Sequence, residues 1–132
     1  MRIVLFLVLV LCSCKNYTPP VKSCVAGVYV GEDSTIESFD KYGAKMFGKC
    51  LNIQKQNDGS HYYANVKLDQ IGDDVFKFDY ITATDFGVGL DSDIHQIRRV
   101  GTVTFYGNRV VVIYSVGDTC SKMSHFKFEG WR

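Results

Sequence analysis

One short segment of the protein gathers side chains that can do chemistry: Asp91, Asp93, His95, Arg98 and Arg99 lie within nine positions. A histidine beside carboxylates suits general acid–base catalysis, because the carboxylate orients the imidazole and stabilises its charged form. Two aspartates at alternate positions also suit calcium, although an EF-hand loop needs further ligands and a closing glutamate. Nearness in sequence does not establish hydrogen-bond reach. We therefore predict a solvated loop here, with neither a catalytic base nor a metal site.

The rest of the sequence has no catalytic or cofactor motif. The patterns GxSxG, HExxH and GxGxxG and the P-loop are all absent. The other two histidines, His61 and His125, lie far from His95 and from each other in the sequence. The surroundings of the cysteines resemble no cysteine-protease family. We therefore predict that the protein is not an enzyme and binds no cofactor or metal.

The sequence has five cysteines, of which Cys12 and Cys14 belong to the N-terminal segment. Cys24, Cys50 and Cys120 remain, and their spacing fits neither a short zinc-ligand pair nor a CxxC redox pair. Three cysteines in an oxidising compartment allow one disulfide. We predict the Cys50–Cys120 pair, because both residues flank predicted strands, with Cys24–Cys120 as the alternative. Closing that long loop adds about 3–5 kcal/mol of stability in the chain-entropy model.

The N-terminus has the layout of a secretory signal. Arg2 precedes nine consecutive apolar residues, 3–11, and the small residue Ser13 follows them closely. The apolar run is too short to span a bilayer, which needs about 20 residues. We predict a signal peptide over residues 1–13, which directs the protein out of the cytoplasm.

Residues 11–14 resemble a bacterial lipobox, in which cleavage precedes a cysteine that receives a lipid, although Cys12 replaces the usual small or aliphatic residue. The resemblance implies that Cys14 is acylated and that residues 14–23, which contain both prolines, form a lipid-anchored tether. Lys15 after the cysteine resembles the outer-membrane sorting pattern of enteric-type bacteria. The alternative is an ordinary signal peptide and a freely secreted protein, of bacterial or eukaryotic origin.

Composition and charge indicate one neutral, aromatic-rich domain over residues 24–132. Without Arg2 the protein has 14 basic and 14 acidic residues, and the two signs are interspersed. This balance argues against nucleic acid as a partner, because phosphate binding needs a concentrated basic surface. Nine Phe and eight Tyr with only two Pro favour a packed β domain over disorder.

From residue 49 onward the apolar residues follow the period of two that is typical of strands. Asp58-Gly59 and Gly107-Asn108 are hairpin signals between apolar runs. Because short turns join successive runs, we predict a mainly β fold, an antiparallel meander of about seven strands that closes into a small barrel. The expected strands cover residues 24–31, 49–54, 62–69, 76–82, 100–106, 109–116 and 124–131.

Residues 34–47 carry a helical pattern instead. Ser34 and Glu37 have the spacing of a capping box, and four apolar residues recur after them at helical intervals. Gly48 is suited to end a helix, while Gly43 in the middle costs about 1 kcal/mol relative to Ala. We predict a short helix over 34–47, with an irregular loop as the alternative.

Three short motifs resemble lipocalin-like barrels. Residues 27–29 (Gly-Val-Tyr) resemble the GxY or GxW element that opens the first strand of many such proteins. Residues 48–53 then lead into the hairpin at 58–59, and after Cys120 the sequence ends in an aromatic-rich run with Trp-Arg at 131–132. The arrangement is similar to small bacterial periplasmic barrels, including lipid-anchored lysozyme inhibitors. It implies a lipocalin-like barrel in the cell envelope, held at the outer membrane and facing the periplasm.

Our first functional hypothesis is a binding protein that blocks an incoming hydrolase, either a lysozyme or a toxin delivered by a rival cell. Loops on a rigid scaffold carry recognition, and interfaces favour aromatic residues and Arg. We expect residues 85–99 to form the contact loop, with the apolar side chains as anchors and the two aspartates facing basic groups of the target. The predicted contact residues are Phe86, Leu90, Asp91, Asp93, His95 and Arg98.

Two other functions remain open. Inward aromatic residues usually form a core, but a small barrel also encloses a cavity in some proteins, so a carrier of a small hydrophobic ligand is the first alternative. The second alternative is a structural lipoprotein that docks to an outer-membrane complex.

Overall fold

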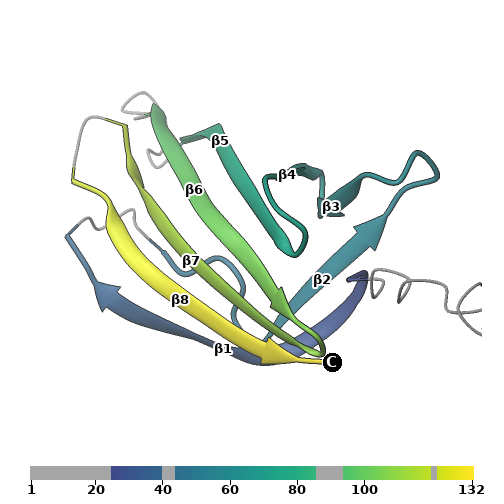
Figure 1. The fold of residues 1–132 in the computed structure, drawn as a ribbon. Helices are drawn as coiled ribbons and strands as arrows, with labels where there is room; N and C mark the ends of the chain where they lie inside the picture. Colours follow the sequence, from purple (N-terminus) through teal and green to yellow (C-terminus); the bar gives the residue numbers. More distant parts are fainter. Residues whose placement is uncertain (1–24, 40–43, 86–93, 120–121) are drawn as a thin grey trace, which may run out of the picture.

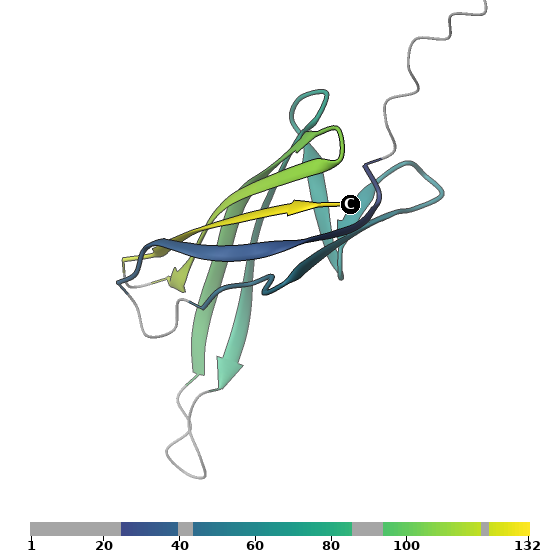
Figure 2. The same ribbon diagram turned by 90° about the horizontal axis from the view of Figure 1, so that it is seen from below.

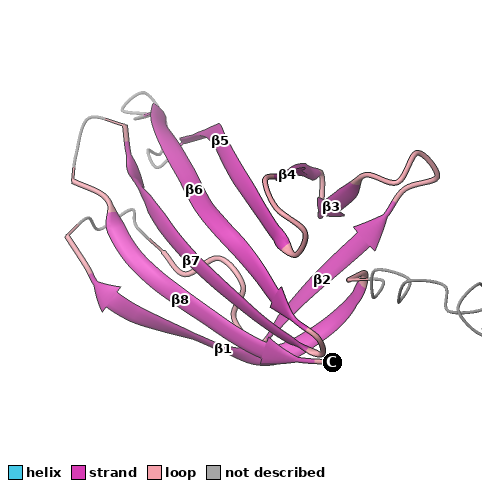
Figure 3. Cartoon of the chain, viewed as in Figure 1, coloured by secondary structure: helices cyan, strands magenta, loops and turns pink. Residues whose placement is uncertain are grey.

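The computed structural model describes residues 25–39, 44–85, 94–119 and 122–132, and every helix or strand within them is a β-strand (Figure 3). In sequence order the strands are β1 (Gly27–Glu37), β2 (Cys50–Lys55), β3 (His61–Tyr63), β4 (Val66–Gln70), β5 (Val75–Asp85), β6 (Ile94–Tyr106), β7 (Arg109–Asp118) and β8 (Ser124–Trp131).

These eight strands form one closed barrel, in which each strand pairs antiparallel with the next and β8 pairs with β1 (Figure 1). The predicted antiparallel barrel is therefore confirmed, with eight strands in place of about seven. The additional strand arises because a turn at Ala64 divides the expected strand 62–69. Ala64 has a φ of +50°, and Tyr63 pairs with Val66 across the turn.

The helix predicted over residues 34–47 is wrong, because β1 continues to Glu37. Thr35 lies opposite Phe126 of β8, and the Ser34 hydroxyl donates a hydrogen bond to the backbone carbonyl of Lys127. Helix propensity and a capping pattern are worth little next to the pairing and burial that a neighbouring strand supplies. Residues 44–49 are irregular, as the alternative prediction had it.

Alternate residues of the strands point into the barrel and form its core. Phe126 and Phe128 of β8 face inward as predicted, and both are almost fully buried. The rings of Tyr114 and Phe126 stack with their centroids 5.3 Å apart. Each phenylalanine removed from water in this way stabilises the fold by about 1.5–3 kcal/mol. The core is therefore mainly aromatic and aliphatic, which makes the barrel a rigid scaffold.

One end of the barrel, which we call the tether end, is closed by the segment that leads into β1. Val25 is buried, and the Tyr29 hydroxyl donates to its carbonyl at 2.8 Å. Arg132 donates to the carbonyl of Ala26 at 2.9 Å. The β6–β7 hairpin turns at the same end, where Gly107 has a φ of +63°. The predicted tether precedes Val25 in the sequence, hence the name.

At the opposite end, β5 and β6 extend beyond their neighbours. The pairing of β6 with β7 stops at Ile97 and Asp118, whereas residues 83–85 of β5 remain paired with residues 94–96 of β6. These residues form a two-stranded arm that projects from the barrel (Figure 2). The arm and Tyr106 are separated along β6 by more than about 30 Å, at roughly 3.3 Å a residue. The arm therefore points away from the tether end.

The predicted Cys50–Cys120 disulfide is not formed in the structure, where Cys50 is an exposed free thiol. Cys50 lies two strands from Trp131 at the tether end, whereas Thr119, the residue before Cys120, follows β7 at the other end. The length of β8 therefore separates Cys50 from Thr119 by roughly 20 Å. The Cα atoms of two cysteines joined by a disulfide lie no more than about 7 Å apart. The alternative Cys24–Cys120 pair lies outside the described residues and stays a prediction.

No helix that is both long and apolar enough to cross a membrane occurs among the described residues. The predicted signal peptide over 1–13 and the predicted lipidation site at Cys14 lie outside the described residues. Secretion and lipid anchoring therefore stay predictions.

Candidate functional site

The centre of the barrel is filled by Phe47, which comes from the segment between β1 and β2. Its ring centroid lies 5.0 Å from those of Tyr63 and Tyr114 and 5.5 Å from that of Phe128. The cavity beside these rings measures about 10 Å³, which is about the space that one water molecule needs. This part of the described interior therefore leaves no room for an enclosed lipophilic ligand.

Residues 44–48, which we call the strap, are held to the barrel by Asp33 of β1. Its carboxylate accepts hydrogen bonds from the backbone N–H of Phe47 at 2.7 Å and of the next residue at 2.6 Å. It also accepts one from the Tyr114 hydroxyl at 2.6 Å, and that hydroxyl accepts the N–H of Met46 at 3.0 Å. Hydrogen bonds to a carboxylate are stronger than neutral ones. This network fixes the strap across the barrel.

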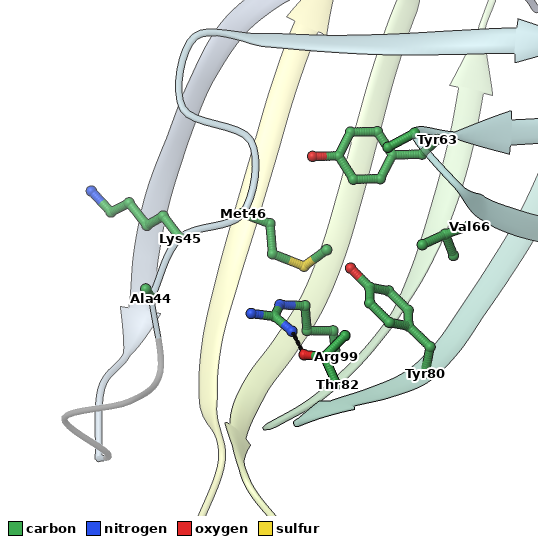
Figure 4. Close-up of a pocket in the computed structure, with 9 residues that line it drawn as sticks. Ala44, Lys45, Met46, Tyr63, Val66, Tyr80, Thr82 and Arg99 are labelled. Carbon is green, nitrogen blue, oxygen red and sulfur yellow. Dashed lines mark hydrogen bonds between the residues drawn. The ribbon is translucent and has the colours of Figure 1, made fainter. Parts of the chain in front are cut away.

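Beside the strap, a pocket of about 430 Å³ opens to solvent (Figure 4). We call it the mouth pocket. It forms because β4 and β5 pair through only two residue pairs, at Lys77 and Phe76 of β5, and then part. Its walls are the strap, the β3–β4 turn and inward-facing residues of β5 and β6. The side chains that define it are Lys45, Met46, Tyr63, Val66, Tyr80 and Arg99.

Arg99 brings a positive charge into the mouth pocket. It shares the inward face of β6 with the buried Ile97, two residues away. Its guanidinium donates to the Thr82 hydroxyl at 2.6 Å and lies 5.9 Å from the centre of the Tyr80 ring. Among the described residues, no carboxylate forms an ion pair with Arg99. The guanidinium is therefore held in position while its charge stays unneutralised.

The hydroxyls of Tyr63 and Tyr80 point into the same space (Figure 4). Neither makes a hydrogen bond to another described residue. Burial raises the pKa of both phenols, and the nearby Asp33 carboxylate raises that of Tyr63 further. Both hydroxyls therefore remain protonated donors at neutral pH. With Arg99 they provide the pocket with donors, and no Asp or Glu is among its described lining residues, although Asp33 lies near Tyr63.

The structure describes only part of the predicted contact loop, 85–99. Arg98 belongs to β6 and not to a loop, and its guanidinium binds Asp79 on the outer surface at 2.9 and 2.6 Å. These hydrogen bonds hold the pKa of Asp79 below its ordinary value. The backbone of His95 is also part of β6. The remaining predicted contacts lie outside the described residues: Phe86, Leu90, Asp91 and Asp93.

The sequence pattern does not predict the residues of the mouth pocket as a site. Arg99 falls within the expected contact loop, and the loop prediction assigns it no different role from Arg98. In a strand, however, two consecutive side chains face opposite sides. Ile97, Arg99 and Val103 lie at odd positions, and this alternation is the signal that places Arg99 inside. No such signal exists for Tyr63, because the turn at Ala64 changes the phase of the pattern.

Comparison with known proteins gave no match: no protein-family model, no curated protein and no solved structure corresponds to this sequence. In the part of the protein that the structure describes, no group of three His, Cys, Asp or Glu side chains is arranged to hold a metal ion. The function is therefore inferred from the geometry of the barrel's two ends and of the mouth pocket.

Proposed function

We propose that this protein is a non-enzymatic envelope protein that binds and blocks an incoming hydrolase, either a lysozyme or a delivered toxin. The observation that supports it is an open pocket of about 430 Å³ beside a strap, on a barrel whose described interior is filled. An open pocket on a rigid scaffold suits a group that projects from a large partner. An enclosed cavity, which suits a carried lipid, is missing from the described interior.

The arm favours the same function. Residues 83–85 and 94–96 extend the β5–β6 hairpin beyond β7, and the predicted contact loop, 85–99, begins and ends on these two strands. An extended hairpin on a rigid barrel is a suitable way to present a recognition loop. Arg99 of the mouth pocket lies on the same two-stranded unit, three residues from the arm. The arm and the mouth pocket therefore lie on the same pair of strands, from which one partner can contact both.

The predicted tether and the arm lie at opposite ends of the barrel, an arrangement that suits a tethered inhibitor. The described residues begin at Val25, at the end of the barrel opposite the arm. If Cys14 carries a lipid, the membrane lies on the tether side and the arm points away from it. The contact surface then remains accessible to a protein that enters the periplasm.

An inhibition titration tests this proposal. The mature protein is added to a panel of lysozymes and secreted cell-wall hydrolases, and the residual activity of each is measured. We expect stoichiometric inhibition of at least one enzyme. A variant with Phe86, Asp91 and Asp93 all replaced by Ala should then inhibit at least tenfold less well. Ile71→Ala, an exposed residue in the β4–β5 turn, is the matched control and should inhibit normally. Normal inhibition by the triple variant would contradict the proposed contact surface.

A small-molecule carrier is the second candidate, and the volume of the mouth pocket favours it, because 430 Å³ falls in the range of small-ligand sites. The ligand would lie at the mouth, beside Met46 and Val66, and not within the filled interior. Native mass spectrometry of the protein from its own host tests this candidate. A bound small molecule of constant mass supports it, and a protein of bare mass from every preparation contradicts it.

A further inference from the structure

We propose that the mouth pocket binds a carboxylate attached to an apolar or aromatic group, and that the blocked partner supplies it as a projecting acidic residue or as its terminal carboxylate. This inference rests on the proposed function and specifies the chemistry of the partner. Three independent features of the described residues support it: an unneutralised guanidinium, two unused hydroxyl donors and an apolar wall.

The guanidinium of Arg99 is the first feature. Arginine presents a planar set of N–H donors that matches the two oxygens of a carboxylate. Only one of these donors is used in the described structure, by the Thr82 hydroxyl at 2.6 Å. Thr82 and the Tyr80 ring hold the arginine in place, so little side-chain entropy remains to be lost when an anion binds. Because a half-buried charge without an acidic partner is costly, an anion is the favoured occupant.

The adjacent Arg98, on the same strand, is paired with a carboxylate and serves as a comparison. Its guanidinium makes two hydrogen bonds to the carboxylate of Asp79, at 2.9 and 2.6 Å, on the outer surface. Arg99, one position further on, faces inward and has a hydroxyl where Arg98 has a carboxylate. The proposed ligand supplies the missing carboxylate at the inward position.

The two tyrosine hydroxyls are the second feature. The hydroxyls of Tyr63 and Tyr80 both point into the pocket toward the region of Met46 (Figure 4). Neither is used within the described structure, and both remain donors at neutral pH because burial raises the pKa of each phenol. A carboxylate has about four lone-pair sites, so it accepts from Arg99 and from a phenol at the same time.

The apolar wall is the third feature. Met46 of the strap, Val66 of β4 and the two tyrosine rings bound the pocket beside the donors. Methionine adapts its shape to its neighbours and makes favourable contacts with aromatic groups. A ligand with an apolar body next to its acid therefore buries that body against these side chains, which distinguishes it from a free inorganic anion.

Calorimetric titration with hexanoate, and with hexanamide as its uncharged counterpart, tests the pocket without any knowledge of the partner. We expect hexanoate to bind the mature protein at least about tenfold more tightly than hexanamide, because only the acid pairs with Arg99. Arg99→Gln should remove this preference, and Arg99→Lys should restore part of it. Arg98→Gln is the matched control and should leave it unchanged. Equal binding of acid and amide, or an unchanged preference in Arg99→Gln, would overturn the proposal.

The partner enzyme from the inhibition panel supplies the second arm of the experiment. If Arg99→Gln loses both hexanoate binding and inhibition, the carboxylate comes from the partner, as proposed. If Arg99→Gln binds no hexanoate but inhibits normally, the partner does not use the pocket and this inference fails, while the proposed function stands. If hexanoate binds through Arg99 but no hydrolase is inhibited, the carboxylate site is correct, its source is a free acid, and the proposed function fails.

Discussion

The inward faces of β5 and β6 change character along their length. Toward the tether end they carry Phe76, Phe78, Val103 and Phe105, which are almost completely buried. Toward the arm the same alternating positions carry Tyr80, Thr82 and Arg99, which line an open pocket. Two strands thus build a structural core in one half and a polar site in the other, and the strap with Phe47 lies between them. The difference shows that the interior stabilises the barrel, whereas the mouth is available for recognition.

This division has a physical origin in strand pairing. Where β4 pairs with β5, at Phe76 and Lys77, the barrel wall is continuous and the inward rings are covered. Beyond those pairs β4 turns away, so Tyr80, Thr82 and Arg99 line a pocket that is open to solvent, while Ile97, nearer the arm on β6, stays buried. A charged residue at one of the covered positions would be buried without a partner, at a cost of several kcal/mol. Arg99 is tolerated because it lies beyond the point where the wall opens.

The largest effect is expected from Phe47→Ala, which removes the ring that separates the two halves. Phe47 is 8% exposed and contacts three aromatic rings, so its loss should destabilise the protein by about 3–5 kcal/mol. Urea denaturation measures the change. Phe39→Ala is the control, because Phe39 is 45% exposed and should cost much less. Equal costs for the two variants would show that Phe47 does not fill the core.

A smaller effect is expected from Asp33→Asn, which keeps the size of the residue but removes its charge. The carboxylate accepts three hydrogen bonds that fix the strap and Tyr114, and its loss should cost about 1.5–3 kcal/mol. Hydrogen exchange should show faster opening of the strap. Glu32→Gln, at the exposed neighbouring position, is the control and should leave the denaturation midpoint unchanged. A strap that exchanges at its original rate in Asp33→Asn would contradict the assigned role of Asp33.

The loss of stability at high pH should also originate near the strap, from Tyr114. Burial, and then the hydrogen bond to Asp33, raise the pKa of Tyr114 in the folded state. The unfolded state loses this proton at about pH 10 while the folded state keeps it, so stability falls as the pH rises above that value. We expect Tyr114→Phe to show a shallower loss of stability between about pH 9 and pH 11, to be measured by thermal unfolding. An identical slope in the variant would assign the alkaline transition to other groups.

The smallest effect on stability is expected at the mouth itself. Arg99→Gln should change the free energy of unfolding by no more than about 0.5 kcal/mol, because Arg99 is only half-buried and makes one hydrogen bond. A parallel denaturation series with Phe47→Ala measures this contrast directly. Strong destabilisation by Arg99→Gln would show that the mouth is part of the structural core and would break the division between the two halves.

The alternation of buried and exposed residues along the strands allows most of the barrel to be predicted from the sequence. It predicts the final strand, with Phe126 and Phe128 inside, and the hairpins at 58–59 and 107–108. The prediction fails at residues 34–37, where a capping pattern with helical spacing lies in a strand. Pairing of Thr35 with β8 decides that segment, and no local pattern reports a partner that lies 91 positions away.

The candidate site is harder to predict than the fold, because its residues lie where the alternation of apolar and polar residues is interrupted. The segment before Ile97 has no clear period, so the sequence places Arg98 and Arg99 together in a loop and not on opposite faces of β6. Residues 44–47 of the strap fall within the predicted helix, and nothing local marks Asp33 as the carboxylate that binds the strap. Both features arise from contacts between distant segments, which one sequence does not reveal.

The division between a structural interior and a recognising mouth is tested most directly by mapping hexanoate on the protein with ¹H–¹⁵N NMR spectra. We expect shifts at Arg99, Thr82, Tyr80 and the strap that saturate together and vanish in Arg99→Gln, with little change at Phe105 or Trp131. Shifts that centre on the tether end, or that persist unchanged in Arg99→Gln, would contradict this division.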